Sequence, residues 1–135
     1  MNRTAIRGVI LLTAAMLCLP ALGQQKNSVE RLNPRVRLLV QSSPLAGFRY
    51  HAAAELWPQF QLGDVLELSR EPDNPHDANA VSVSWRGRKL GYVPRRENIA
   101  LAWGMDRGEP LTARISRLTQ HANPARRMEF EVFIE

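Results

Sequence analysis

Successive side chains of a strand point to opposite faces, so a strand with one buried face repeats every two residues. That period of apolar and polar positions recurs in five stretches: 66–70, 80–85, 90–93, 111–118 and 128–134. The last is the plainest, because apolar residues stand at every even position from 128 to 134 and glutamates stand at 129 and 131. The second half of the chain is therefore predicted to be mainly β.

Turn residues separate these stretches. Arg-Gly at 86–87 offers a tight reversal into the strand at 90–93, which Pro94 ends. Asn-Pro at 123–124 turns the chain before the closing strand. Six or so short strands connected in this way, with one short helix, predict a small, curled, mostly antiparallel barrel.

The first half of the chain has weaker patterns. Residues 36–40 predict the first strand, with the side chains at 36, 38 and 40 facing one way. Ser-Ser-Pro at 42–44 predicts a bend, and residues 52–57 predict a short helical turn that Pro58 limits.

One convincing helix is predicted over residues 99–107. Asn98 is a reasonable N-cap, and Gly108 fits the C′ position just after the helix. The tryptophans stand in apolar surroundings and are predicted to lie in the core: Trp57, Trp85 and Trp103.

Residues 70–77, with the sequence REPDNPHD, interrupt the strand pattern. Pro72 and Pro75 lack a backbone donor and restrict the residue before them, so the strand cannot continue. The Asp and Asn residues at 73, 74 and 77 can close turns with their own side chains. A rigid loop that carries charged, amide and imidazole groups is a candidate binding site.

The sequence REPDNPHDANAV at 70–81, followed by KLGYVPR at 89–95, closely resembles the HIRAN domain. The resemblance extends over roughly residues 40–133. It implies a small OB-like β-barrel. In this family the domain is found in DNA translocases that remodel stalled replication forks, and bacteria also have it as short stand-alone proteins. Members of the translocase kind bind single-stranded DNA and capture its free 3′ end.

The resemblance also implies roles for six residues. Arg49 is similar to the family's phosphate ligand, and Tyr50 to its base-stacking aromatic residue. Asn74 and His76 match the segment that encloses the terminal nucleotide, and Asp77 matches the carboxylate that accepts a hydrogen bond from the 3′-hydroxyl.

Two positions depart from the family's eukaryotic members. His76 stands in place of Tyr, and Tyr92, the sixth residue, stands in place of a phosphate-binding His. A Tyr hydroxyl can donate to phosphate but carries no charge, so a weaker or differently aimed contact with DNA is expected at this position. Further candidate phosphate contacts are basic residues near the motif: Arg86, Arg88, Lys89 and Arg95.

Plainer interpretations stand beside these roles. Tyr50 can be an aromatic residue at the edge of the core, and Arg49 a solvated charge. Asp77 can simply pin its turn to backbone amides. Tyr92 can equally belong to the barrel core.

The N-terminal segment predicts a targeting signal. Arg3 and Arg7 form a basic region, an apolar run extends to Leu19, and the small residues at 21 and 23 suit signal peptidase cleavage before Gln24. The expected organisation is a signal peptide at 1–23, a flexible leader at 24–35 and the HIRAN domain at 36–135. The expected location is the periplasm or the cell exterior.

Charge and composition narrow the function. Without Arg3 and Arg7 the chain has 16 basic residues against 13 acidic ones, a net charge of +3, which is only mildly basic. The three histidines are scattered and no CxxC or HxxxH spacing occurs, so no metal, cofactor or catalytic site is predicted. Two hypotheses remain open: a single-stranded nucleic-acid binder, or a cell-envelope interaction module that uses the same groove for a peptide or a glycan.

Overall fold

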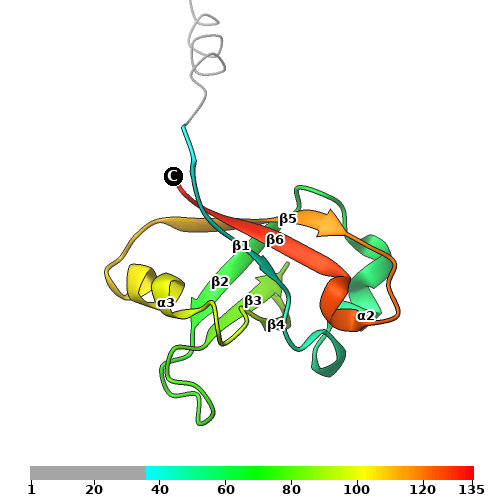
Figure 1. Ribbon diagram of the computed structural model, residues 1–135, viewed down its shortest axis with the longest axis horizontal. Helices are drawn as coiled ribbons and strands as arrows, with labels where there is room; N and C mark the ends of the chain where they lie inside the picture. Colours follow the sequence, from blue (N-terminus) through cyan, green and yellow to red (C-terminus); the bar gives the residue numbers. More distant parts are fainter. Residues whose placement is uncertain (1–35) are drawn as a thin grey trace, which may run out of the picture. The chain divides into compact units, whose positions relative to one another are not determined.

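The computed structural model describes residues 36–135, and the predicted signal peptide and leader lie outside this range (Figure 1). The strands are β1 (Leu38–Pro44), β2 (Val65–Arg70), β3 (Val81–Trp85), β4 (Arg88–Tyr92), β5 (Leu111–Leu118) and β6 (Met128–Ile134). The α-helices are α2 (Ala53–Leu56) and α3 (Ile99–Asp106), and three 3-10 turns are η1 (Phe48–Tyr50), η2 (Trp57–Gln59) and η3 (Pro124–Arg126). No helix within 36–135 is both long and apolar enough to cross a membrane.

The six strands form one antiparallel sheet in the order β1-β6-β5-β2-β3-β4. The sheet is not closed along its length, but its two edges meet at one isolated bridge. There Ala46 donates its amide to the Tyr92 carbonyl and Tyr92 donates to the Ala46 carbonyl, each at 2.9 Å. The predicted OB-like, mainly β fold is confirmed, and α2 adds a second short helix at the expected helical turn.

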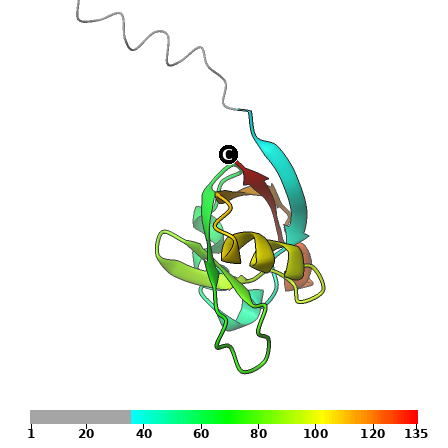
Figure 2. The same cartoon turned by 90° about the vertical axis from the view of Figure 1, so that its left-hand side faces the viewer.

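The concave side of the sheet holds the core. Met128, Phe130 and Val132 of β6 are buried, as their spacing predicts. Leu101 and Ala102 of α3 pack into the same cluster. The loop between β2 and β3 projects from this body in both views (Figures 1 and 2). The core therefore provides a rigid base from which a polar loop extends.

Two expectations about the surface are wrong. The first strand is 38–44 rather than 36–40, because Ser43 is buried and donates its hydroxyl to the Glu97 carboxylate at 2.8 Å, so the serines do not end the strand. Trp103 is 59% exposed, because it lies on the outer side of α3 while Leu101 and Ala102 face the core.

Gly91 occupies the tightest place in the fold, at the bridge between the two sheet edges. A Cβ atom at this position would overlap the carbonyl oxygen of Ala46, which is backbone and cannot move aside easily. Gly108, just after α3, also has a positive φ of 79°, but a Cβ atom there would meet nothing within 4 Å. Comparing alanine variants at these two glycines therefore distinguishes the cost of steric overlap from the cost of backbone strain alone.

We expect Gly91→Ala to lower the free energy of unfolding by about 3 kcal/mol, since it forces the bridge apart. Gly108→Ala should cost only about 1 kcal/mol, the ordinary penalty of a left-handed conformation for alanine. Urea denaturation measures both values. Equal losses in the two variants would show that the bridge does not constrain the fold.

Candidate functional site

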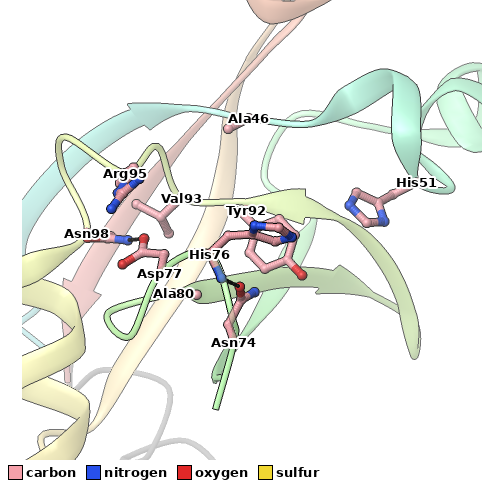
Figure 3. A pocket seen from close by; sticks show the side chains of 10 residues that line it. All are labelled: Ala46, His51, Asn74, His76, Asp77, Ala80, Tyr92, Val93, Arg95 and Asn98. Carbon is pink, nitrogen blue, oxygen red and sulfur yellow. Dashed lines mark hydrogen bonds between the residues drawn. The ribbon is translucent and has the colours of Figure 1, made fainter. Parts of the chain in front are cut away.

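A pocket of ≈ 370 Å³ lies where the β2–β3 loop faces the bridge between the sheet edges (Figure 3). Its walls come from four places in the sequence: the loop, the end of β4, the turn before α3 and the segment 46–51. The lining residues are Ala46, His51, Asn74, His76, Asp77, Ala80, Tyr92, Val93, Arg95 and Asn98. The pocket thus joins parts of the chain that are far apart in sequence.

Local polar bonds hold the loop in shape. Asn74 accepts a hydrogen bond from the His76 amide at 2.9 Å, and Asp77 accepts one from the Asn79 amide at 2.9 Å. These are the turns that Asn and Asp side chains favour. At the base of the loop, the Glu71 amide donates to the Ala80 carbonyl at 3.0 Å. The His76 side chain is left exposed near the tip.

Asp77 also connects the loop to α3. Its second carboxylate oxygen accepts a hydrogen bond from the Asn98 side-chain amide at 2.7 Å. Asn98 is 1% exposed and makes no side-chain capping bond to its own helix, although it stands at the N-cap position. The plainer interpretation of Asp77, a turn-pinning residue, is therefore correct as far as it goes. Each oxygen has one protein partner, and the residue also borders the pocket.

Glu71, Lys89 and Tyr92 form a polar group beside the pocket, which we call the Glu71 cluster. The Tyr92 hydroxyl donates to Glu71 at 2.8 Å, the Lys89 ammonium donates to the Tyr92 hydroxyl at 3.0 Å, and Lys89 forms an ion pair with Glu71. Asn74 donates to the same carboxylate at 3.1 Å. The hydrogen bond from Lys89 holds the pKa of Glu71 below its usual value, and Glu71 raises the pKa of Lys89.

Two aromatic rings, those of His51 and Tyr92, line one part of the pocket. The ring of His51 meets the ring of Tyr92 edge to face at 5.5 Å, and the Lys89 ammonium lies 4.8 Å from the centre of the Tyr92 ring. Tyr92 is half-buried, so it is neither a core residue nor a free surface side chain. Its ring can contact an occupant of the pocket while its hydroxyl is held by Glu71.

The structure divides the six predicted site residues between two places. Asn74, His76, Asp77 and Tyr92 line the pocket. Arg49 and Tyr50 line a separate hollow of ≈ 260 Å³ against residues 123–125, and Tyr50 is 83% exposed. Both hollows border the segment 46–51.

The four further basic candidates also differ in position. Arg95 is exposed and lines the pocket. Lys89 is held in the Glu71 cluster. Arg88 pairs with Glu55 at 2.8 Å and thereby lowers the pKa of that carboxyl, while Arg86 lies 4.2 Å from the Trp85 ring. Arg95 is therefore the one of these four that lines the pocket.

Three functional candidates were not predicted: Glu71, His51 and Asn98. Asn98 was recognised only as the start of a helix, and nothing in the spacing of the sequence connects His51 to residue 92. Glu71 lies in the polar loop, but two of the three side chains that donate to it come from β4, a separate part of the sheet. Among residues 36–135 no group of three His, Cys, Asp or Glu side chains could hold a metal ion.

Comparison with known proteins identifies relatives of this fold. A family model described as the HIRAN domain matches residues 38–135. Helicase-like transcription factor of the rabbit Oryctolagus cuniculus is 33% identical over 63 residues, which are 46% of this chain and 6% of that protein. The chain thus spans a small part of that relative.

Two solved structures resemble the chain. A protein from Lactobacillus plantarum has a TM-score of 0.65 and 27% identity, with 73% of this chain and 95% of that chain covered. The HIRAN domain of human HLTF has a TM-score of 0.56 and 24% identity, with coverages of 73% and 78%. The likeness to the human domain concerns the fold alone.

We expect Asp77→Ala to lower the free energy of unfolding by about 2 kcal/mol, because the buried amide of Asn98 loses its acceptor. Asn98→Ala should cost a similar amount. The double variant should lose less than the sum, by about 1 kcal/mol, because both changes remove one bond. Asn123→Ala is the matched control. Asn123 accepts a hydrogen bond from the Ala125 amide, as Asp77 does from the Asn79 amide, but at an exposed position. Additive losses of Asp77→Ala and Asn98→Ala in urea denaturation would contradict the coupling.

Proposed function

The chain belongs to the HIRAN domain family, and from that premise we propose that it is a binding module for single-stranded nucleic acid. The observation that carries the proposal is the pairing of the pocket beside the β2–β3 loop with the neighbouring hollow of Arg49 and Tyr50 along one segment, 46–51. One hollow offers hydrogen-bonding groups, and the other offers an exposed aromatic ring beside a guanidinium. Single-strand binders combine these two elements.

Each hollow suits a different part of a nucleotide strand. Tyr50 is exposed enough to accept a base on its ring, and Arg49 beside it matches the fork of a phosphate. Asn74 and His76 on the loop enclose the last nucleotide of the strand. Arg95, at the rim of the pocket, contacts a neighbouring phosphate.

Asp77 gives the pocket a preference for a strand end. A carboxylate oxygen has two lone pairs, and each oxygen of Asp77 uses one for a protein donor. The remaining lone pairs accept a bond from a 3′-hydroxyl. A 3′-phosphate in the same place is disfavoured by repulsion between like charges. The module binds and does not catalyse.

Arg49→Ala should weaken binding of a single strand of about ten nucleotides by about tenfold and lower its salt dependence by about one phosphate contact. Arg107→Ala, an exposed arginine at the end of α3, is the matched control and should bind as the wild type does. Fluorescence anisotropy with a 5′-labelled strand measures both. The variants are produced from the full-length chain so that natural processing takes place.

The same titration tests the strand end. The wild type should prefer a 3′-hydroxyl to a 3′-phosphate, Asp77→Ala should lose the preference, and Asn98→Ala, which keeps the carboxylate, should retain it. Equal binding of both strand ends by the wild type would refute the role of Asp77. No binding of any strand, together with copurification of an envelope protein, would favour the alternative function instead.

We also propose that the chain is exported to the periplasm or the cell exterior. The basic start, the short apolar run and the small residues at 21 and 23 support this proposal. The mass of the protein recovered from its producing cell should correspond to a chain that begins at Gln24. Recovery of the uncleaved chain from the cytoplasm would rule out this processing.

A further inference from the structure

The Glu71 cluster has no role in the binding scheme described above, although it adjoins the pocket. Lys89 and Tyr92 both donate to the carboxylate of Glu71, and all three side chains are partly exposed. The side chains of Lys89 and Glu71 are 37% and 27% exposed. Solvent, and therefore a ligand, can reach this ion pair.

The two donors form an anion-binding arrangement. An ammonium and a phenol hydroxyl that converge on one carboxylate would converge equally on two oxygens of a phosphate. Tyr92 belongs to both the cluster and the pocket lining, so the cluster and the pocket are in direct contact. Glu71 occupies the position that a phosphate oxygen would take.

We propose that Glu71 competes with the nucleic acid for Lys89 and Tyr92. A strand phosphate must displace the Glu71 carboxylate from these two donors to bind there. This proposal rests on the proposed function and adds to it a residue that limits affinity. Lys89 is thus a phosphate contact only when Glu71 has moved away.

The competition operates at neutral pH. The hydrogen bond from Lys89 lowers the pKa of Glu71, so its carboxylate stays charged well below pH 7. A charged Glu71 both holds Lys89 and repels an incoming phosphate. A ligand must therefore bring additional contacts, such as those with Arg49 and Arg95, to offset the displacement.

The arrangement also predicts selectivity between phosphate sources. Free inorganic phosphate has no base or sugar to contact Tyr50 or the loop, so it cannot offset the loss of the Glu71 interactions. A single strand has both a base and a sugar, so it can offset this loss. Glu71 thereby excludes abundant small anions from a site that has to accept a polymer.

The loop responds to the same event. Asn74 donates to Glu71 and accepts a bond from the His76 amide, so it links the cluster to the tip of the loop. Displacement of Glu71 removes one support of Asn74. Binding at Lys89 is therefore coupled to the loop wall that encloses the last nucleotide.

Glu71→Gln is the decisive variant, because it keeps the shape of the side chain and removes its charge. We expect it to bind the single strand about threefold to tenfold more tightly. Its affinity should also fall more steeply with salt concentration, by the amount that corresponds to about one additional phosphate contact. Inorganic phosphate should compete with the strand in this variant but not in the wild type. Glu67→Gln, an exposed glutamate on β2, is the matched control for the loss of one negative charge.

Lys89→Gln completes the test. In the wild-type background it should weaken binding less than it does in the Glu71→Gln background, because Glu71 already holds the Lys89 ammonium there. In the Glu71→Gln background it should remove the whole gain. Thermal unfolding of each full-length variant checks that the fold is retained.

The outcomes separate this proposal from the proposed function. If the wild type binds the strand and Glu71→Gln binds no better while remaining folded, the cluster only supports the loop and the competitor role is wrong. A gain equal to that of Glu67→Gln would reduce the effect to net charge and also refute it. If neither the wild type nor Glu71→Gln binds any strand at low salt, the proposed function itself fails and this proposal fails with it.

Discussion

The pair of hydrogen bonds between Ala46 and Tyr92 determines where a site can form in this fold. It joins the last residues before η1 to the end of β4, and so brings together the two edges of an otherwise open sheet. The approach requires a residue without a side chain next to Tyr92, which Gly91 provides. Because of this contact the segment 46–51 lies opposite the β2–β3 loop, and a pocket remains between them.

The loop side chains hold the loop in shape and also border the pocket. Asn74 and Asp77 satisfy backbone amides of their own turns, and Asp77 also satisfies a buried amide on the next helix. These bonds fix the side chains before any ligand arrives, which lowers the entropic cost of binding. Both side chains also line the pocket. A turn-forming role therefore does not exclude the ligand contact proposed for Asp77.

Ion pairs with glutamates and aspartates determine which basic side chains are left without an acidic partner in the folded protein. Arg88, Lys89 and Arg117 are each paired with a glutamate. Among residues 36–135 neither Arg49 nor Arg95 forms an ion pair, and these two border the two hollows. The weak net charge of the chain thus says little about where its unpaired basic side chains lie. The proposed binding surface depends on the positions of these arginines, and the proposed competition depends on the pairing of Lys89 with Glu71.

The sequence by itself determined the strands, the family and most of the loop, because these depend on local alternation, turn residues and a long contiguous motif. It predicted β5 and β6 within a residue and the turns of Asn74 and Asp77. It could not place β1, where Ser43 is bonded to the distant Glu97, nor the exposed Trp103. It also could not show that Asn98 meets Asp77 or that Glu71 holds Lys89 and Tyr92. Those contacts join residues about twenty positions apart, and only the pairing of β2, β3 and β4 and the packing of α3 bring them within hydrogen-bonding distance.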